Sequence, residues 1–184
     1  MKNNIGNWEF SSKGTSAMNW FKDFFKAFFV FLLLQIFVIQ GFVIEGSCME
    51  PELHSEEKII VNKMIYKLRE PKHGEVVVFK YPLEPEKDFI KRVVGLPGDE
   101  ISIKNGSLYR NQEKLDEDYV KEYVFGNYGP VMVPQGQLCV MGDNRNNSHD
   151  SRTWGMLDES LLKGRAELTF WPPKAFGLVH NSKE

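Results

Sequence analysis

The chain has 184 residues, the usual size of one domain with an appended segment rather than of two full domains. Its 23 Lys and Arg against 25 Asp and Glu give a net charge of −2, which excludes a strongly basic nucleic-acid binder and an acidic disordered tail. Hydrophobic residues make up 42% of the chain and aromatic residues 13%, a composition typical of a folded protein.

The N-terminal quarter contains a long apolar run. Residues 27–44 carry no charge, and apolar residues from position 24 extend the run. As an α-helix, 27–44 would cover about 27 Å, close to the ~30 Å hydrocarbon core of a bilayer. A buried core helix is the alternative, which Gln35 and Gln40 favour, but the run has no polar stripe to face solvent. The sequence therefore predicts a transmembrane anchor over residues 24–44.

The positions of the lysines predict the orientation of this anchor. Four lysines precede the uncharged run 27–44: Lys2, Lys13, Lys22 and Lys26. The next cationic residue is Lys58. Because positively charged flanks stay in the cytoplasm, we expect residues 1–23 to be cytoplasmic and residues 45–184 to lie outside the plasma membrane. The segment 43–46 is a poor signal-peptide cleavage site, which favours a permanent single-pass anchor.

Residues 45–184 have the pattern of a β-rich domain. Short runs of β-branched and aromatic residues, bounded by turn residues, predict strands. These runs lie at residues 58–63, 75–80, 89–94, 101–109, 137–141 and 166–171. Asn105-Gly106 between two alternating runs predicts a type I′ hairpin. One short helix is expected near residues 158–162. The predicted fold class is mainly β, an antiparallel β-sheet domain on a single N-terminal transmembrane helix.

Three blocks of this domain contain residues that could take part in catalysis. Residues 45–53 read EGSCMEPEL, residues 90–99 read IKRVVGLPGD, and residues 142–155 read GDNRNNSHDSRTWG. Taken singly, each block has an ordinary structural explanation. The segments LPGD and GDN are typical of turns, and a single lysine on a strand is usually a solvated edge charge.

Together, and in this order behind an apolar segment, the three blocks resemble the type I signal peptidases. The resemblance covers about residues 40–172 and includes GEVVVF at residues 74–79. It implies a membrane-anchored Ser/Lys endopeptidase, with its catalytic domain outside the plasma membrane, that removes signal peptides from exported preproteins after small-x-small motifs. The implied partners are signal peptides and the lipid bilayer, with no nucleic acid and no cofactor.

The resemblance also implies the catalytic pair. The family pattern SMxPTL corresponds to CMEPEL at residues 48–53, which places Cys48 at the position usually held by the nucleophilic serine. Glu52 stands where threonine is usual, and Met49 belongs to the implied substrate-binding set. Ser47 lies one residue too early and would face the opposite side of an extended strand. The general base carries over to Lys91.

Further residues of the site follow from the same matching. Ser148 is expected to hydrogen-bond the Lys91 amine. A charged scaffold beneath the site is expected from Asp143, Arg145, Asp150 and Arg152, although charged residues of this kind also form ordinary surface ion pairs. Oxyanion donors are expected at the Cys48 amide and near Gly46, which lacks the hydroxyl that some family members carry at this position.

A Cys–Lys pair is chemically competent. A free lysine has a pKa of about 10.4, so a lysine base needs an apolar, buried environment that favours its neutral form. A free thiol has a pKa of about 8.5, so a cysteine next to a lysine can instead form a thiolate–ammonium pair. In that case the ammonium is available to protonate the leaving amine.

Other constellations in the sequence are weaker. The four histidines have no metal-ligand spacing, and Cys48 and Cys139 form no Cys-x-x-Cys motif, so no metal site is predicted. His149 could form an alternative Cys/His dyad with Cys48. A Cys48–Cys139 disulfide is possible outside the cytoplasm, but Cys139 lies in an apolar run typical of a core strand.

The alternative function is that of a catalytically weak or inactive paralogue, which binds signal peptides or an active partner peptidase. Cys48 and Glu52 at unusual positions favour this alternative. Retention of Lys91 and Ser148 favours activity, because a protein released from catalysis has no structural need for a buried amine.

Overall fold

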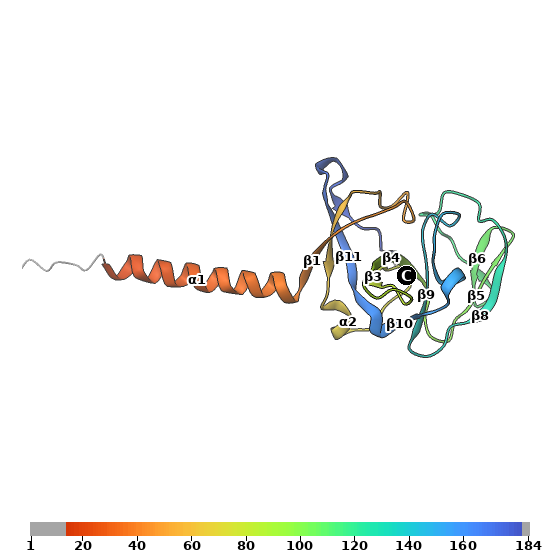
Figure 1. Ribbon diagram of the computed structural model, residues 1–184, viewed down its shortest axis with the longest axis horizontal. Coiled ribbons are helices and arrows are strands. Elements are labelled where there is room, and N and C mark those ends of the chain that lie inside the picture. The colour runs from red at the N-terminus through yellow and green to blue at the C-terminus, as the bar shows by residue number, and fades with distance from the viewer. Residues whose placement is uncertain (1–13, 182–184) are drawn as a thin grey trace, which may run out of the picture. The chain divides into compact units, whose positions relative to one another are not determined.

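The computed structural model describes the backbone of residues 14–181, and side chains at positions 19–33 and 38–181. Contacts divide the chain into an N-terminal unit that ends at Ile36 and a C-terminal unit that begins at Phe37. The N-terminal unit contains helix α1, Gly14–Phe37, of 24 residues (Figure 1). Large apolar side chains between Trp20 and Leu33 are exposed along it.

The predicted anchor over residues 24–44 is wrong at its C-terminal end. The helix stops at Phe37, and Ile39–Val43 forms strand β1, which pairs antiparallel with β2, Lys58–Asn62. Apolar composition alone does not distinguish a helix from a strand, and here pairing with β2 decides for the strand. Among the described residues, no helix has both the length and the hydropathy that crossing a membrane requires.

The C-terminal unit is built on a large antiparallel sheet with the strand order β1-β2-β11-β3-β4-β9-β10, and β12 pairs with β11 (Figure 1). The further strands of this sheet are β3 (Val76–Lys80), β4 (Asp88–Gly95), β9 (Gln137–Met141), β10 (Leu157–Asp158), β11 (Leu162–Trp171) and β12 (Gly177–Leu178). The mainly antiparallel β-sheet domain predicted from the sequence is confirmed.

A smaller sheet follows β4 in the chain and has the order β7-β6-β5-β8. Its strands are β5 (Glu100–Lys104), β6 (Ser107–Arg110), β7 (Glu113–Lys114) and β8 (Tyr128–Met132). The predicted hairpin at Asn105-Gly106 is confirmed, because both residues have positive φ and Lys104 pairs with Ser107 across the turn.

Four short helical segments complete the fold. They are α2 (Ile65–Leu68), α3 (Ser151–Trp154), η1 (Glu159–Leu161) and η2 (Pro173–Ala175). The helix expected near residues 158–162 is the 3-10 helix η1. The other three were not predicted, because one turn of helix is too short for a periodic apolar pattern. The Asp150 side chain caps α3 by accepting from the Arg152 amide.

The core positions two segments that carry predicted site residues, strand β4 and the segment that follows β1. Strand β3 buries Val76 through Phe79 without interruption, and β4 lies between β3 and β9. A continuous apolar run of this kind is typical of a central strand. In the segment that follows β1, the buried side chains of Ile44, Met49 and Leu53 join the same core. The central strand and this segment are therefore fixed against each other.

The turn after β4 is held by the Asp99 carboxylate, and the pKa of this group makes the stability of the fold depend on pH. Asp99 accepts from the Leu96 amide at 2.8 Å and from Asn111 Nδ2 at 2.8 Å, and it lies 2.7 Å from His73 Nε2. Burial alone would raise the pKa of the Asp99 carboxyl, but these hydrogen bonds outweigh burial and hold that pKa below its usual range.

We expect Asp99→Asn to lower the free energy of unfolding at pH 7 by about 1–3 kcal/mol, because the ionised carboxylate accepts three hydrogen bonds. A lowered pKa stabilises the fold above the unfolded value and loses that effect as the pH falls through the folded value. The difference between the two proteins should therefore shrink in acid. Urea unfolding at neutral and acidic pH measures this, with the exposed Asp116→Asn as control. A constant difference at both pH values contradicts the assignment.

Candidate active site

Cys48 lies on a turn between β1 and β2. The turn is closed by hydrogen bonds from the Glu50 amide to the Ser47 carbonyl at 3.2 Å and from the Leu53 amide to the Met49 carbonyl at 3.0 Å. Met49, a predicted substrate-binding residue, is fully buried, so its side chain packs in the core. Cys48 itself is half-buried and is a free thiol.

Lys91 lies on β4, opposite Val77 of β3. Its side chain is only 3% exposed. The amine Nζ donates to Cys48 Sγ at 2.9 Å and to the Ile90 carbonyl at 2.8 Å, and it lies 5.2 Å from the centre of the Phe89 ring. The two residues predicted to form the catalytic pair are thus in direct contact, although 43 positions separate them in the chain.

This contact has the geometry that nucleophilic catalysis needs. A nucleophile and its base must lie within hydrogen-bond reach for a proton to pass between them. Water has little access to a buried amine, so the contact is not screened as a surface pair would be. The arrangement can therefore activate the Cys48 sulfur and later return a proton to a leaving group.

Two asparagines that the sequence analysis missed hold the nucleophile turn. The Asn144 amide donates to the Cys48 carbonyl at 3.1 Å, and Asn144 Nδ2 donates to the Ser47 carbonyl at 3.1 Å. Asn147 Nδ2 donates to Ser47 Oγ at 2.8 Å, so the Ser47 hydroxyl is engaged away from Lys91. Both asparagines belong to the block GDNRNNS, whose polar residues read in the sequence as ordinary turn formers.

Ser148 and Gly46 differ from what the resemblance implies. Among the described residues, the buried Ser148 hydroxyl makes no hydrogen bond to the Lys91 amine, which bonds to other atoms, and the Ser148 side chain instead lowers the pKa of the Asp150 carboxyl. The role of Ser148 stays a prediction. The Gly46 amide donates to Ser55 Oγ at 3.3 Å, whereas in the described part of the chain the Cys48 amide donates to no backbone carbonyl. The Cys48 amide is therefore the better candidate for an oxyanion donor.

The glycine that opens this block allows a close approach to the nucleophile turn. A Cβ placed on Gly142 would lie 2.4 Å from the Cys48 carbonyl oxygen and 2.4 Å from Ser148 Oγ. Real Cβ atoms do not come so close to backbone, so only glycine fits between the two segments.

Asp143 lies beneath the site in an ion pair with Arg92. Both side chains are fully buried, and the guanidinium holds the carboxylate through two hydrogen bonds, Nε to Oδ1 at 2.8 Å and Nη2 to Oδ2 at 2.7 Å. Arg92 Nη1 also donates to the carbonyls of Gly74 at 2.7 Å and His180 at 2.6 Å. A bidentate pair with this many additional partners has a single favoured geometry.

The other predicted scaffold residues also form ion pairs. Arg145 pairs with Glu117 at 2.5 Å, and Arg152 pairs with Asp150 at 2.7 Å. Asp150 in turn accepts from the Gly142 amide at 3.1 Å. Burial would raise the pKa of the Asp150 carboxyl, but Arg152, Ser148 and the Gly142 amide together outweigh burial and lower it. Two partners in these ion pairs, Arg92 and Glu117, were not among the four scaffold residues expected from the sequence.

The two alternatives for Cys48 are not formed in the structure. His149 Nε2 lies 2.9 Å from the hydroxyl of Tyr81, and the polar contacts of Cys48 Sγ are with Lys91 Nζ and the Ile90 carbonyl. Cys139 is a free thiol, fully buried, and burial raises its pKa to about 12. A Cys48–Cys139 disulfide is therefore not present.

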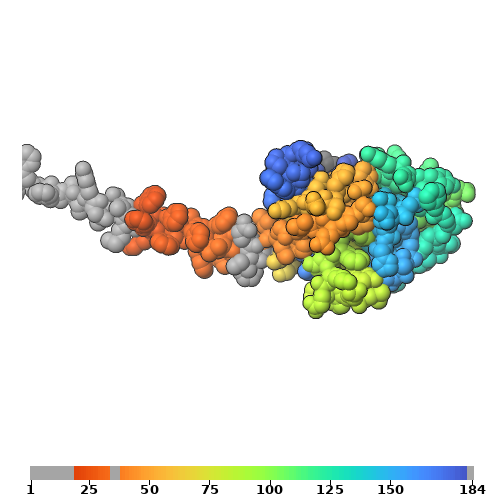
Figure 2. Space-filling view, turned by 45° about the horizontal axis from the view of Figure 1, so that its top comes forward, coloured from red at the N-terminus to blue at the C-terminus, as the bar shows by residue number. Residues whose placement is uncertain are grey.

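A cleft of about 530 Å³ opens onto the Cys48–Lys91 pair. It lies between the end of β1 with its following segment and the start of β4. In Figure 2 the orange surface of the first segment lies beside the yellow-green surface of the β3–β4 connection. Its lining is mostly apolar: Phe42, Val43, Ile44, Glu45, Cys48, Ile59, Val78, Lys87, Asp88, Phe89, Ile90, Lys91 and His149.

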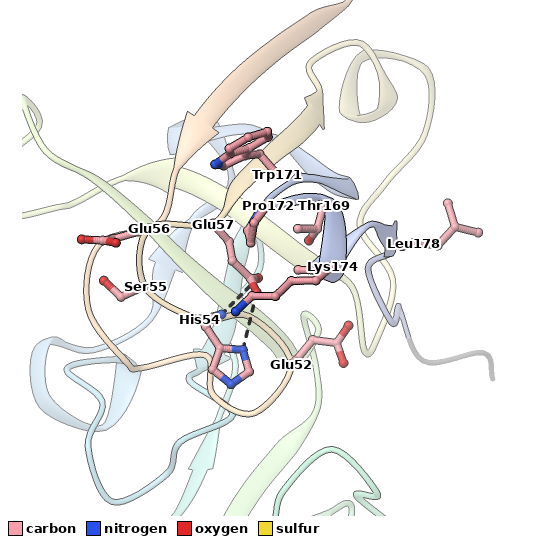
Figure 3. A pocket seen from close by; sticks show the side chains of 12 residues that line it. Glu52, His54, Ser55, Glu56, Glu57, Thr169, Trp171, Pro172, Lys174 and Leu178 are labelled. Atoms are coloured by element: carbon pink, nitrogen blue, oxygen red, sulfur yellow. Dashed lines mark hydrogen bonds and ion pairs between the residues drawn. The ribbon is translucent and has the colours of Figure 1, made fainter.

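A second hollow, of about 770 Å³, contains neither member of the pair. Figure 3 shows its lining, which includes Trp171, Lys174 and several carboxylates around His54. His54 lies beside Glu57, whose Oε2 accepts a hydrogen bond from the His54 amide at 3.2 Å. Within the described residues, no group of three or more His, Cys, Asp or Glu side chains is placed to hold a metal ion.

Comparison with known proteins gives a consistent family assignment. The family described as "Signal peptidase, peptidase S26" matches residues 17–171. The chain is 43% identical to "Probable signal peptidase I-2" of Synechocystis sp., over 82% of this chain and 72% of that protein. It is 34% identical to "Signal peptidase I" of Bacillus licheniformis, over 88% of this chain and 92% of that protein.

Among solved structures, a signal peptidase I from Enterococcus faecalis aligns with 53% of this chain and 97% of its own, at 28% identity and a TM-score of 0.48. The sequence matches extend over most of the chain and include all three blocks that carry the site. The chain belongs to the signal peptidase family S26 and is a peptidase of the signal peptidase I class.

Proposed function

We propose that the protein is an endopeptidase that cleaves signal peptides from exported preproteins after small-x-small motifs, with Cys48 as nucleophile and Lys91 as base. The observation that carries this proposal is the 2.9 Å contact between Cys48 Sγ and Lys91 Nζ at the floor of an apolar cleft. The names of the relatives support the substrate class.

The proposed reaction follows from the contacts of the pair. The Cys48 sulfur attacks the scissile carbonyl carbon, and the Cys48 amide stabilises the developing oxyanion. The Lys91 ammonium gives its proton to the leaving amine, which departs as the N-terminus of the mature protein. A thioester on Cys48 remains. Lys91, now neutral, takes a proton from water, which attacks the thioester and releases the signal peptide.

The shape of the cleft supports an extended peptide as substrate. The cleft runs beside the end of β1 and the start of β4, where a strand-like peptide can lie against exposed strand edges. Side chains of Ile44, Val78 and Ile90 line it together with the pair. Shallow apolar walls of this kind accept small residues at the positions before the cleaved bond and exclude large ones.

We further propose that α1 anchors the protein in the plasma membrane, with the N-terminus in the cytoplasm and the catalytic unit outside. Exposed aromatic side chains around the helix, such as Trp20, Phe24 and Phe28, support burial in lipid. A helix of 24 residues is about 36 Å long, so its length, though not its hydropathy over the described residues, matches the ~30 Å hydrocarbon core. Lysines on the N-terminal side support the orientation.

The alternative of an inactive paralogue has less support. A binding protein gains nothing from an amine kept at 3% exposure, because burying it costs free energy. The contacts of the amine with Cys48 Sγ and the Ile90 carbonyl offset part of that cost, and use of the amine in catalysis accounts for its retention.

The first prediction concerns Cys48. A thiol alkylator should inactivate the enzyme, and mass spectrometry should place the adduct on Cys48 rather than on the fully buried Cys139. Cys48→Ala should be inactive. Cys48→Ser should resist alkylation and cleave at least as fast as the natural form, because the shorter C–O bond suits the oxyanion geometry. Full activity in Cys48→Ala would move the nucleophile elsewhere, with Ser47 the nearest candidate.

The second prediction concerns Lys91. Lys91→Ala and Lys91→Arg should each lower kcat by about 10²–10⁴-fold, because neither side chain can act as a base near neutral pH. Cleavage of a preprotein by the purified protein in detergent measures this. The control is Lys104→Arg, a matched change at an exposed position of β5. Near-normal activity in Lys91→Arg would remove the base role, and His149→Ala would then be the variant to test.

A further inference from the structure

We propose that the site also joins polypeptides, by transferring the acyl group held on Cys48 to the α-amine of a second peptide. This inference rests on the proposed function, because both reactions pass through the same acyl-enzyme. The substrate of the added reaction is a peptide with a free N-terminus, which competes with water for the acyl group.

The nucleophilic atom of the proposed reaction is the Cys48 sulfur. Cys48 Sγ is the side-chain atom in contact with Lys91 Nζ, at 2.9 Å. The neighbouring Ser47 hydroxyl accepts a hydrogen bond from Asn147 Nδ2. In the described part of the chain, the Ser148 hydroxyl makes no hydrogen bond to either member of the pair. The acyl-enzyme is therefore a thioester rather than the oxygen ester that a serine would form.

Such an intermediate divides between water and amines. When an amine adds to an oxygen ester, the amine is a better leaving group than the alkoxide, so much of the adduct reverts. When an amine adds to a thioester, the thiolate competes with the amine as leaving group, because a thiol has a pKa of about 8.5, close to that of an α-amine and far below that of an alcohol. More of the adduct then goes forward to an amide. Hydrolysis by water is not accelerated to the same extent by the change from oxygen ester to thioester. A cysteine nucleophile therefore shifts the products from the free acid toward the amide.

The site already receives an α-amine. The group that leaves in the cleavage reaction is the N-terminal amine of the mature protein, and it departs past Lys91. By microscopic reversibility, an incoming amine follows the same path to the same position. Because an α-amine has a pKa of about 8, a large share is neutral at pH 8 and attacks without help from a base, whereas water must give a proton to Lys91.

The surroundings of the pair suit this acceptor. The cleft walls beside Cys48 are mainly apolar and limit the access of water. Besides Lys91, the charged side chains at the cleft are Glu45, Lys87 and Asp88, and Asp88 is paired with Lys163 at 2.6 Å. Glu45 is exposed and has no ion-pair partner among the described residues, so it is free to attract the ammonium form of a peptide N-terminus.

The step balances without any further reagent. The amine nitrogen forms a bond to the thioester carbonyl carbon, and the bond from that carbon to Sγ breaks with its electron pair going to sulfur. Lys91 takes the proton that the nitrogen gives up and passes it to Sγ. The products are an amide and the free Cys48 thiol, with no change of oxidation state.

The test uses the full-length enzyme in detergent and a synthetic peptide with one small-x-small site. Triglycine is added as the acceptor at increasing concentration at pH 8. Liquid chromatography with mass spectrometry measures two products, the N-terminal fragment with a free carboxylate and the same fragment joined to triglycine. Cys48→Ser is the matched control, since it changes one atom and makes the oxygen ester.

We expect the ratio of conjugate to free acid to rise in proportion to triglycine and to be at least about tenfold higher for the natural enzyme than for Cys48→Ser. Equal ratios in the two proteins would overturn the inference, as would a natural enzyme that gives only the free acid at every triglycine concentration. If Cys48→Ser makes neither product, the natural enzyme alone decides. Failure of the natural enzyme to cleave the peptide at all would instead contradict the proposed function, and the inference with it.

Discussion

The buried contact between Lys91 Nζ and Cys48 Sγ is the interaction on which the rest of the site depends. An amine at 3% exposure gives up its hydration and needs compensating partners, which here are the sulfur at 2.9 Å and the Ile90 carbonyl at 2.8 Å. Such a contact tolerates little displacement, because a shift of about 1 Å costs on the order of a hundredfold in rate. Both partners must therefore be held by rigid structure.

Strand β4 positions both members of the proposed catalytic pair through two adjacent side chains. Consecutive residues of a strand face opposite sides of the sheet, so Lys91 points to the cleft while Arg92 points to the buried scaffold. Arg92 holds Asp143 through two hydrogen bonds, and the next residue, Asn144, donates to the Cys48 carbonyl. One strand thus carries Lys91, the proposed base, and, through the ion pair, fixes the turn that carries Cys48, the proposed nucleophile.

Features with a local cause could be predicted from the sequence. The Asn105-Gly106 hairpin depends on two residues that tolerate positive φ. The pairing of Cys48 with Lys91 has no local cause and was expected only from the resemblance to the type I signal peptidases. Contacts between distant residues could not be predicted in this way. No local pattern relates Arg145 to Glu117, which lie 28 positions apart. The end of α1 at Phe37 was also missed, because the apolar residues that follow suit a helix or a strand equally well.

The central claim is that Cys48 carries the acyl group during cleavage. The most direct measurement is rapid quenching of the intact enzyme with a preprotein, followed by mass spectrometry of the Cys48 peptide. The account predicts a transient adduct with the mass of the signal peptide on Cys48, which hydroxylamine removes and which does not form in Lys91→Ala. An adduct on Ser47, or cleavage with equal speed when Cys48 is permanently alkylated, would contradict it.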